Sequence, residues 1–337
     1  MTIADVKSGA KHERLVEWAN ALGDIPVDPL YVISPSGIAT RFDDQLKKYF
    51  GLAALSRSKS ADQKLVGEAY SQVFQARVIL ERAIQDAILI TVDREPSALE
   101  GILKGSLYGA SKKQGVSLRL PLATCVPTKL CGAACYAHDA LDSTPAAVVR
   151  GAINGALAEL FEMNSDSHSG LIEYLYRSTK TAVREAITDA ERSKWARSPR
   201  IRFSHVGEVV EYPFFTNTLG RWVFELSDGE VQSVIYSRHP KLVKADQKYF
   251  VINLTIDGQS EDRRAWHKPG MRLVYSAFGG ETSSDVAINF LEHHRWVHFD
   301  QIGEGPVCPV TRVDAKERTC DSIQCDLCFS KPHTSDK

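Results

Sequence analysis

Hydrophobic positions in the first third of the chain follow a helical spacing. Apolar residues recur there at three- and four-residue steps, which is the pattern of helices that bury one face. The longest such stretch runs from Ala61 to Thr91, and Arg77 is the one charged position in its apolar stripe, so we expect Arg77 at the edge of the buried face. Shorter helices are expected at Lys11–Leu22, Asp43–Phe50 and Pro96–Lys113. Residues 1–115 are therefore predicted to form an N-terminal helical region.

After residue 115, short apolar runs alternate with helical stretches, which is typical of βα units in a parallel sheet. The expected strands are Val116–Ala123, Arg200–His205, Val231–Ser237, Phe250–Ile256, Arg272–Ala277 and Trp296–Asp300. The expected helices are Ala146–Met163, Gly170–Ala196, Tyr212–Glu225, Pro240–Asp246 and Ser284–His293. Six strands with short crossovers favour an α/β fold with a partial (β/α) barrel over residues 116–300, and an open doubly wound sheet is the alternative. Residues 301–337 are predicted to form a separate tail.

The composition indicates which partners and which cellular location to expect for the protein. The net charge is −1, so no global field draws the chain to nucleic acid or to a membrane surface. No apolar run approaches the roughly 18 residues that a membrane span needs, and the first residues lack the apolar core of a signal peptide. We therefore expect a cytoplasmic protein without membrane contact.

All seven cysteines fall into two groups, which leaves none for an ordinary core position. The first group is Cys125, Cys131 and Cys135, and the tail group is Cys308, Cys320, Cys325 and Cys328. In a reducing cytosol, clustered thiols indicate metal ligands rather than disulfides. Both groups are therefore predicted to bind metal.

The ligand count suggests which metal each group binds. Three thiolates leave one iron of a [4Fe–4S] cluster open, and zinc completed by His138 or Asp139 is the alternative for the first group. Four thiols in the tail can close a second [4Fe–4S] cluster or a structural zinc site, and the Cys325-Asp-Leu-Cys328 knuckle suits either. A third arrangement shares ligands, with Cys308 joining the first group in one four-thiolate centre.

Polar residues follow the predicted strands at their carboxyl ends, where parallel α/β folds place functional groups. They are His205 and Glu208, Ser237 to His239, Asp257 and Gly258, Ser276 to Gly280, and His298 with Asp300. We expect them to converge on one face of the sheet. Glu208 is a candidate to bind an ammonium group or transfer a proton, and His205 is a candidate base, with a structural histidine as the alternative.

A three-cysteine loop after the first barrel strand, with Tyr136 beside the last cysteine, resembles radical S-adenosylmethionine enzymes. That resemblance implies a [4Fe–4S] cluster on the first cysteine group, with S-adenosylmethionine chelated to the open iron. It further implies that Gly207 and Glu208, which match part of the family's Gly-Gly-Glu strand end, contact the cofactor together with Tyr136. Here five and then three residues separate the cysteines, whereas the family's usual spacing is three and then two, and Val206 replaces the first glycine.

The chain is also similar to a cysteine-rich family encoded by phages and plasmids and known from a mycobacteriophage gene product. The similarity spans about residues 116–330 and is carried by Cys131 to Ala137, Arg200 to Gly207, Cys308-Pro309 and the remaining tail cysteines. It implies no settled activity.

Two functions remain as hypotheses from the sequence. The first is an iron–sulfur protein of radical-SAM type acting on an unidentified substrate. The second is a metal-stabilised nucleic-acid-binding accessory protein, in which Arg197, Arg200 and Arg202 beside Trp195 contact phosphate and bases. A solvated helix end is the simpler interpretation of these arginines.

Overall fold

The computed structural model describes residues 25, 27–31, 34–56, 63–111, 115–133, 135, 137, 144–163, 169–193, 198–278, 281–291 and 306–308. Contacts divide the chain into two compact units, each made of two segments. Unit 1 comprises Met1–Gly105 and Leu120–Met163, and unit 2 comprises Ser106–Arg119 and Asn164–Lys337. The chain therefore enters unit 2 for a short segment, returns to unit 1, and completes unit 2 afterwards. Within the described residues, no helix has the length and apolar character to cross a membrane.

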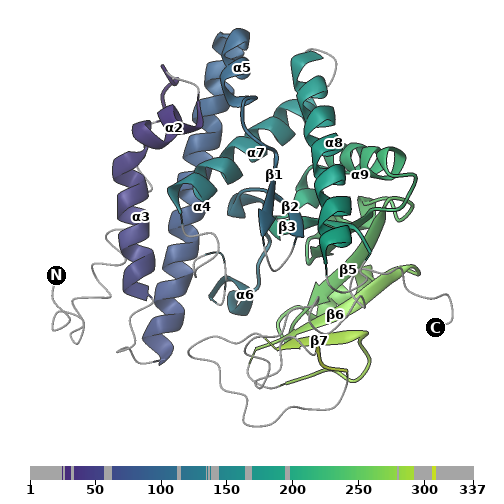
Figure 1. Ribbon diagram of the computed structural model, residues 1–337. Helices are drawn as coiled ribbons and strands as arrows, with labels where there is room; N and C mark the ends of the chain where they lie inside the picture. The colour runs from purple at the N-terminus through teal and green to yellow at the C-terminus, as the bar shows by residue number, and fades with distance from the viewer. Residues whose placement is uncertain are drawn as a thin grey trace. The chain divides into compact units, whose positions relative to one another are not determined.

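Unit 1 is helical in its described part (Figure 1). Its elements are α2 (Pro35–Arg41), α3 (Asp43–Ser56), α4 (Gln63–Arg94), η2 (Pro96–Ala98), α5 (Leu99–Ile102), η3 (Leu122–Thr124), α6 (Lys129–Ala133) and α7 (Pro145–Met163). Helix α4 packs against α3 and α7, and η3 and α6 also lie on it. Ser34 caps α2, because its Oγ accepts the Gly37 N–H at 3.1 Å. The long helix predicted from the apolar spacing is confirmed as α4, whereas Lys11–Leu22 lies outside the described residues.

Arg77 lies inside the core of unit 1 rather than at the edge of the apolar stripe, so that expectation was wrong. Its side chain is 0% exposed, like the neighbouring stripe residues Leu80 and Ile84. The guanidinium is kept there by buried partners, of which the Glu81 carboxylate is the nearest along the helix. A charged side chain can occupy a core position when its charge is paired and hydrogen-bonded.

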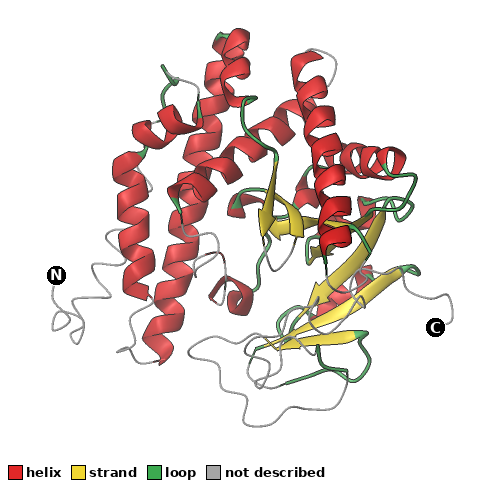
Figure 2. Ribbon diagram, in the orientation of Figure 1, coloured by secondary structure: helices red, strands yellow, loops and turns green. Residues whose placement is uncertain are grey.

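Unit 2 contains a seven-stranded sheet whose strand order follows the chain, from β1 to β7. Its strands are drawn in yellow in Figure 2. The strands are β1 (Tyr108–Ser111), β2 (Gly115–Arg119), β3 (Arg200–Val206), β4 (Gln232–Ser237), β5 (Phe250–Ile256), β6 (Met271–Ala277) and β7 (Ile288–Leu291). β1 pairs antiparallel with β2, and each later pair is parallel. The α/β class is therefore confirmed. This order lacks the reversal that defines a doubly wound sheet, and closure into a barrel stays a prediction.

Helices cover one face of this sheet. α8 (Ser169–Arg192) packs on β2 and β3, and α9 (Pro213–Leu226) packs on β4. The short helices η5 (Val209–Glu211), η6 (Pro240–Lys244) and η7 (Glu261–Trp266) follow β3, β4 and β5. On the covered face the Phe203 and Phe250 rings pack edge to face, with their centroids 5.1 Å apart. Gly220 lets α9 approach this pair, since a Cβ there would lie 2.2 Å from Cζ of Phe250.

Two expected helices contain strands. The Pro96–Lys113 helix ends at Ile102, and β1 follows, because its residues pair with β2 in a hairpin. The expected Ser284–His293 helix contains β7, which pairs with β6 and buries Ile288 and Leu291. Short apolar runs do not distinguish a strand from a helix turn by spacing alone. The expected strand Trp296–Asp300 lies outside the described residues.

Replacing Gly220 by Ala should lower the free energy of unfolding by about 1–3 kcal/mol, because the new methyl group overlaps a ring that the core holds in place. Gly170→Ala is the matched control, since nothing lies within 4 Å of a Cβ at that helical glycine. The control should be neutral or stabilising by up to about 1 kcal/mol. Urea denaturation of both variants measures the difference, and equal stabilities would contradict the close approach of α9 to Phe250.

Candidate functional site

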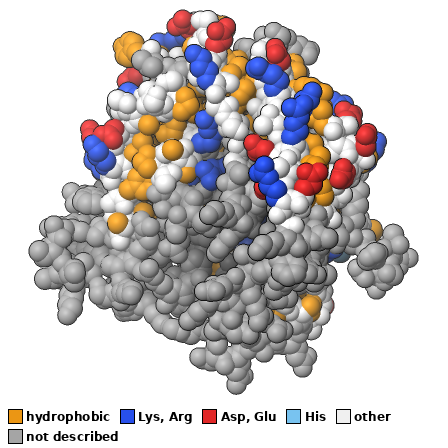
Figure 3. Space-filling model, in the orientation of Figure 1, with side chains coloured by type: hydrophobic (Ala, Val, Ile, Leu, Met, Phe, Trp, Pro, Cys, Tyr) orange, Lys and Arg blue, Asp and Glu red, His pale blue; other side chains and the backbone are white. Residues whose placement is uncertain are grey.

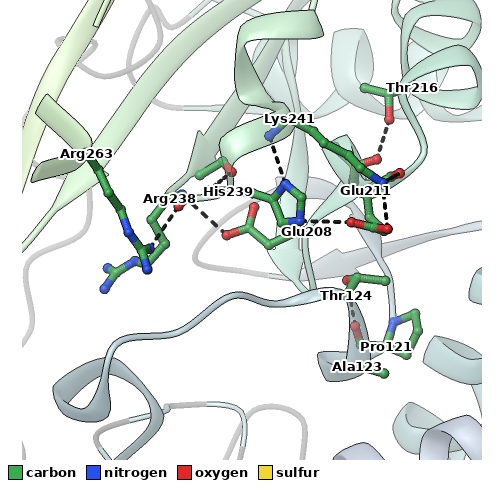
Figure 4. A network of polar contacts seen from close by, with 12 residues as sticks. Pro121, Ala123, Thr124, Glu208, Glu211, Thr216, Arg238, His239, Lys241 and Arg263 are labelled. Carbon is green, nitrogen blue, oxygen red and sulfur yellow. Dashed lines mark hydrogen bonds and ion pairs between the residues drawn. The ribbon is translucent and has the colours of Figure 1, made fainter. Parts of the chain in front are cut away.

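The strand ends of unit 2 meet around Arg238, which directly follows β4. Figure 4 shows Arg238 with Glu208 and Arg263. Nη1 of Arg238 donates to Oδ2 of Asp257, after β5, at 2.6 Å, and its Nη2 donates to Oγ of Ser276, in β6, at 3.3 Å. Its backbone N–H donates to Oε1 of Glu208, after β3, at 3.4 Å. The predicted convergence of strand-end residues is therefore confirmed for four consecutive parallel strands.

Gly207 and Glu208 owe their arrangement to a sharp turn at the end of β3. Gly207 has φ +75°, a conformation that residues with a Cβ adopt at a cost. The turn leads Glu208 into η5 and then α9, while its carboxylate is held at the start of the β4 loop by the Arg238 N–H. The Gly-Glu pair thus has a local structural reason, in addition to the cofactor role that the family resemblance implies.

The Arg238–Asp257 ion pair is held by a network of short bonds. Asp257 is 0% exposed, and its Oδ1 accepts the Ser260 hydroxyl at 3.0 Å and the Gln259 N–H at 2.9 Å. Arg263, on η7, donates from Nη1 to the carbonyl oxygen of Arg238 at 2.9 Å. Such a network fixes the guanidinium plane and gives the strand ends a rigid polar centre.

Glu208 is a buried carboxyl group whose pKa is raised. Burial raises its pKa from the usual 4.5 to about 7, although the Ser237 hydroxyl and the Arg238 charge act in the opposite direction. A carboxyl group that titrates near neutral pH can both give and accept a proton there. The proton-transfer role predicted for Glu208 is compatible with this shift and stays a prediction.

Both ring nitrogens of His239 have a polar partner, and these two contacts fix the orientation of the ring (Figure 4). Its Nδ1 accepts the Lys241 N–H at 3.0 Å, so the proton belongs on Nε2, which lies 2.8 Å from Oε2 of Glu211. Burial lowers the pKa of His239 and favours this neutral ring, and Lys241 Nζ binds the other Glu211 oxygen at 2.7 Å. The His239–Glu211–Lys241 group fixes the start of η6 next to Arg238.

The first cysteine group belongs to unit 1, on a segment that we call the cysteine loop, Leu122–Ala137. Cys125 follows η3, Cys131 lies in α6, where its N–H donates to Oγ1 of Thr128 at 3.0 Å, and Cys135 follows α6. All three are partly exposed. Among the described residues, no three His, Cys, Asp or Glu side chains already form a metal-binding group.

The surroundings of Cys135 favour its neutral thiol over the charged thiolate. Although the residue is partly exposed, desolvation raises the pKa of Cys135 to about 12, and the neighbouring Cys131 adds to this effect. A metal centre that uses Cys135 must therefore displace a tightly held proton.

Cys308 occupies a core position, so the expectation that no cysteine serves in the core was wrong. It is 5% exposed and packs with Val234, Val251, Val274 and Ile288 on strands β4 to β7. Its N–H donates to the carbonyl oxygen of Asn289 at 2.8 Å, which adds a short parallel bridge beside β7. Its role as a metal ligand stays a prediction.

Several predicted site residues fall outside the described part of the chain. They are Tyr136, Arg197, Cys320, Cys325, Cys328, His298 and Asp300. His205 lies in β3, but its side chain is not among those described.

Arg200 and Arg202, two of the three arginines predicted to contact nucleic acid, lie within the sheet. Arg200 is 5% exposed, and the Arg202 guanidinium lies 4.9 Å from the centre of the Tyr236 ring. On the face drawn in Figure 3, Lys and Arg side chains of the described residues are interspersed with Asp and Glu side chains. The surroundings of Arg200 and Arg202 in the structure are therefore those of packed sheet residues.

Sequence reasoning placed Arg77 at the edge of its stripe and did not single out Glu81, so it missed how both residues hold the cysteine loop. Arg77 Nη1 donates to the carbonyl oxygen of Ala137 at 2.8 Å, and Oε2 of Glu81 accepts the Leu122 N–H at 2.5 Å. A Glu four residues after an Arg in an apolar stripe is the signal that points to a buried pair.

Comparison with known proteins found no matching family model, no matching curated protein and no matching solved structure.

Replacing Asp257 by Asn should destabilise unit 2 by about 3–5 kcal/mol, because it removes the carboxylate that balances a largely buried guanidinium. Asp285→Asn is the matched control, since Asp285 binds Arg264 at 2.9 Å but is 66% exposed. That exposed pair should contribute less than about 1 kcal/mol. Chemical denaturation of both variants checks the contrast, and a small effect at both positions would show that Arg238 does not depend on Asp257.

Glu208→Gln should remove a pH dependence of stability between pH 4.5 and about 7. Because burial raises the pKa of the folded state, the protonated carboxyl contributes its full stability below pH 4.5, and this contribution is lost as the pH rises to about 7. Relative to the Gln variant, the wild-type protein should lose about 3 kcal/mol across this range and change little above it. Unfolding free energies at several pH values measure this, and a constant difference between the two proteins would refute the shift.

Proposed function

We propose that this protein is an iron–sulfur enzyme of radical-SAM type whose reaction takes place at the strand ends gathered around Arg238. The observation that carries the proposal is the convergence of Glu208, Arg238, Asp257 and Ser276 at the carboxyl ends of parallel strands that follow the chain order. This is where enzymes with sequentially wound parallel sheets place their substrates. The cysteine loop follows β2, the first parallel strand, as the family resemblance requires.

The thiols of the cysteine loop fit a [4Fe–4S] cluster in kind and number, and cluster binding would bring the three sulfurs to a common centre. Three thiolates leave one iron open, and a reduced cluster supplies one-electron chemistry at that iron. Cys125, Cys131 and Cys135 would hold the cluster. Zinc with a further protein ligand is the alternative for the same thiols, and the tail cysteines are proposed as a second metal site of either kind.

The residues of unit 2 have distinct tasks in this proposal. Glu208 accepts hydrogen bonds and is proposed to bind the amino group of S-adenosylmethionine or to move a proton. Arg238 and Asp257 hold the strand ends in register, so that the Glu208 carboxyl keeps its orientation. Asp257 is fully buried and Glu208 and Arg238 are largely so, which keeps these interactions away from bulk water and strengthens them.

The nucleic-acid-binding alternative has less support from the structure. Arg200 is buried and Arg202 stacks on Tyr236, whereas phosphate contacts need cations that reach solvent. No second function is therefore proposed.

Iron and acid-labile sulfide analysis of anaerobically purified protein tests the proposal. We expect about four iron and four sulfide per cluster and their loss from the first site when Cys125, Cys131 and Cys135 are replaced by Ser. Cys308→Ala is the control from the apolar core and should keep the metal content of the first site. Reduced protein should cleave S-adenosylmethionine, and Glu208→Gln should weaken its binding by about tenfold or more.

Different outcomes would overturn different parts of this proposal. A colourless protein with stoichiometric zinc and no sulfide would exclude the iron–sulfur assignment. Protein with an intact, reducible cluster that leaves S-adenosylmethionine uncleaved would exclude radical-SAM chemistry. Loss of the first cluster in Cys308→Ala would show that Cys308 is a shared ligand.

A further inference from the structure

A fully buried ion pair lies on α4 in the core of unit 1. Nε of Arg77 and Oε1 of Glu81 are 2.8 Å apart, and both side chains are 0% exposed. Stability alone does not account for such a pair, because desolvating two charges is costly and apolar side chains of similar volume often serve as well. The hydrogen bonds that the pair makes to other segments indicate its role.

These hydrogen bonds go to the two ends of the cysteine loop. Glu81 Oε2 accepts the N–H of Leu122, three residues before Cys125, at 2.5 Å. Arg77 Nη1 donates to the carbonyl oxygen of Ala137, two residues after Cys135, at 2.8 Å. One ion pair therefore closes a segment that contains every thiol of the first group.

The surrounding helices hold the ion pair in place. Tyr49, on α3, is fully buried and hydrogen-bonds to Arg77. Gly151, on α7, leaves room for Glu81, since a Cβ there would lie 3.4 Å from Oε1 of Glu81 and 3.6 Å from the Leu120 carbonyl oxygen. Because α3 and α7 pack against the ion pair, the side chains of Arg77 and Glu81 have little freedom to move when the cysteine loop opens.

We propose that Arg77 and Glu81 form a clasp that preorganises the cysteine loop as a binding site for a thiophilic metal centre. The metal part of this inference rests on the proposed function, whereas closure of the loop does not. Fixing both loop ends in advance reduces the conformational entropy that is lost when a metal gathers the three thiols. Arg77 and Glu81 act as positioning residues, because they hold backbone groups on either side of the ligands.

The test compares the metal-free and metal-bound protein in two variants. Arg77→Met combined with Glu81→Leu replaces the clasp by apolar side chains and removes both loop contacts. Arg77→Lys keeps a positive charge for Glu81, but an ammonium group cannot reproduce the fork that also reaches Ala137. Asp43→Leu combined with Lys47→Met is the matched control, since this pair has the same spacing on α3 but is exposed.

The first measurement is the alkylation rate of each loop cysteine by iodoacetamide in metal-free, reduced protein, followed by mass spectrometry. In the double clasp variant, Cys125, Cys131 and Cys135 should react at least about tenfold faster at unchanged helix content, because the loop opens locally more often. In Arg77→Lys the increase should be largest at Cys135, next to the released end. The surface control should react like the wild-type protein. Unchanged rates in both clasp variants would overturn the clasp.

The second measurement is Cd²⁺ affinity, from the thiolate charge-transfer absorption. The double clasp variant should bind Cd²⁺ at least about tenfold more weakly, since it must order the loop on binding. Equal affinity with faster alkylation would overturn the metal-positioning role and leave a structural clasp. A wild-type protein that binds no Cd²⁺ through these thiols would refute the metal assignment of the proposed function, and the alkylation rates would still decide whether the clasp exists.

Discussion

A charge that is taken out of water needs a partner, and in both units of this protein that requirement determines where functional segments are held. In unit 1 the buried Arg77 and Glu81 satisfy each other and the two ends of the cysteine loop. In unit 2 the Arg238–Asp257 pair joins the ends of β4 and β5 and reaches Ser276 and Glu208. Apolar contacts build each core, but they do not select one loop geometry as strictly as a directional, charge-assisted bond does.

The parallel sheet was the most predictable part of the fold. Strand β5 was predicted with its observed bounds, because Phe250–Ile256 is an apolar run interrupted only by Asn253 and Thr255, and every one of its positions is buried. The ends of the strands then located the polar site, since the carboxyl ends of neighbouring parallel strands share an edge. Strands β1 and β7 were missed because each is four residues long, and such runs acquire their strand character from pairing with β2 and β6.

The charged core residues were less predictable, since spacing reports which face is buried but not what a charge on that face contacts. Arg77 was expected at the edge of its stripe because the segments that the ion pair contacts are distant in the sequence: Ala137 is 60 residues from Arg77, and Leu122 is 41 residues from Glu81. Arg200 and Arg202 were grouped as a surface patch on composition, whereas strand geometry buries Arg200 and places Arg202 on Tyr236. In each case a tertiary partner, invisible in a local pattern, decided the environment.

The connection between β2 and β3 explains why the cysteine loop has its own means of support. Residues 120–163 of this crossover belong to unit 1, where η3 and α6 of the cysteine loop lie on α4. In a simple βα unit, the strand and the following helix would fix such a loop at close range. Here the loop extends into a helical unit, and a buried ion pair holds its two ends. The geometry of the cysteine loop and the strand-end network therefore depend on separate sets of contacts, and a substitution in one set can be judged by measurements on the other.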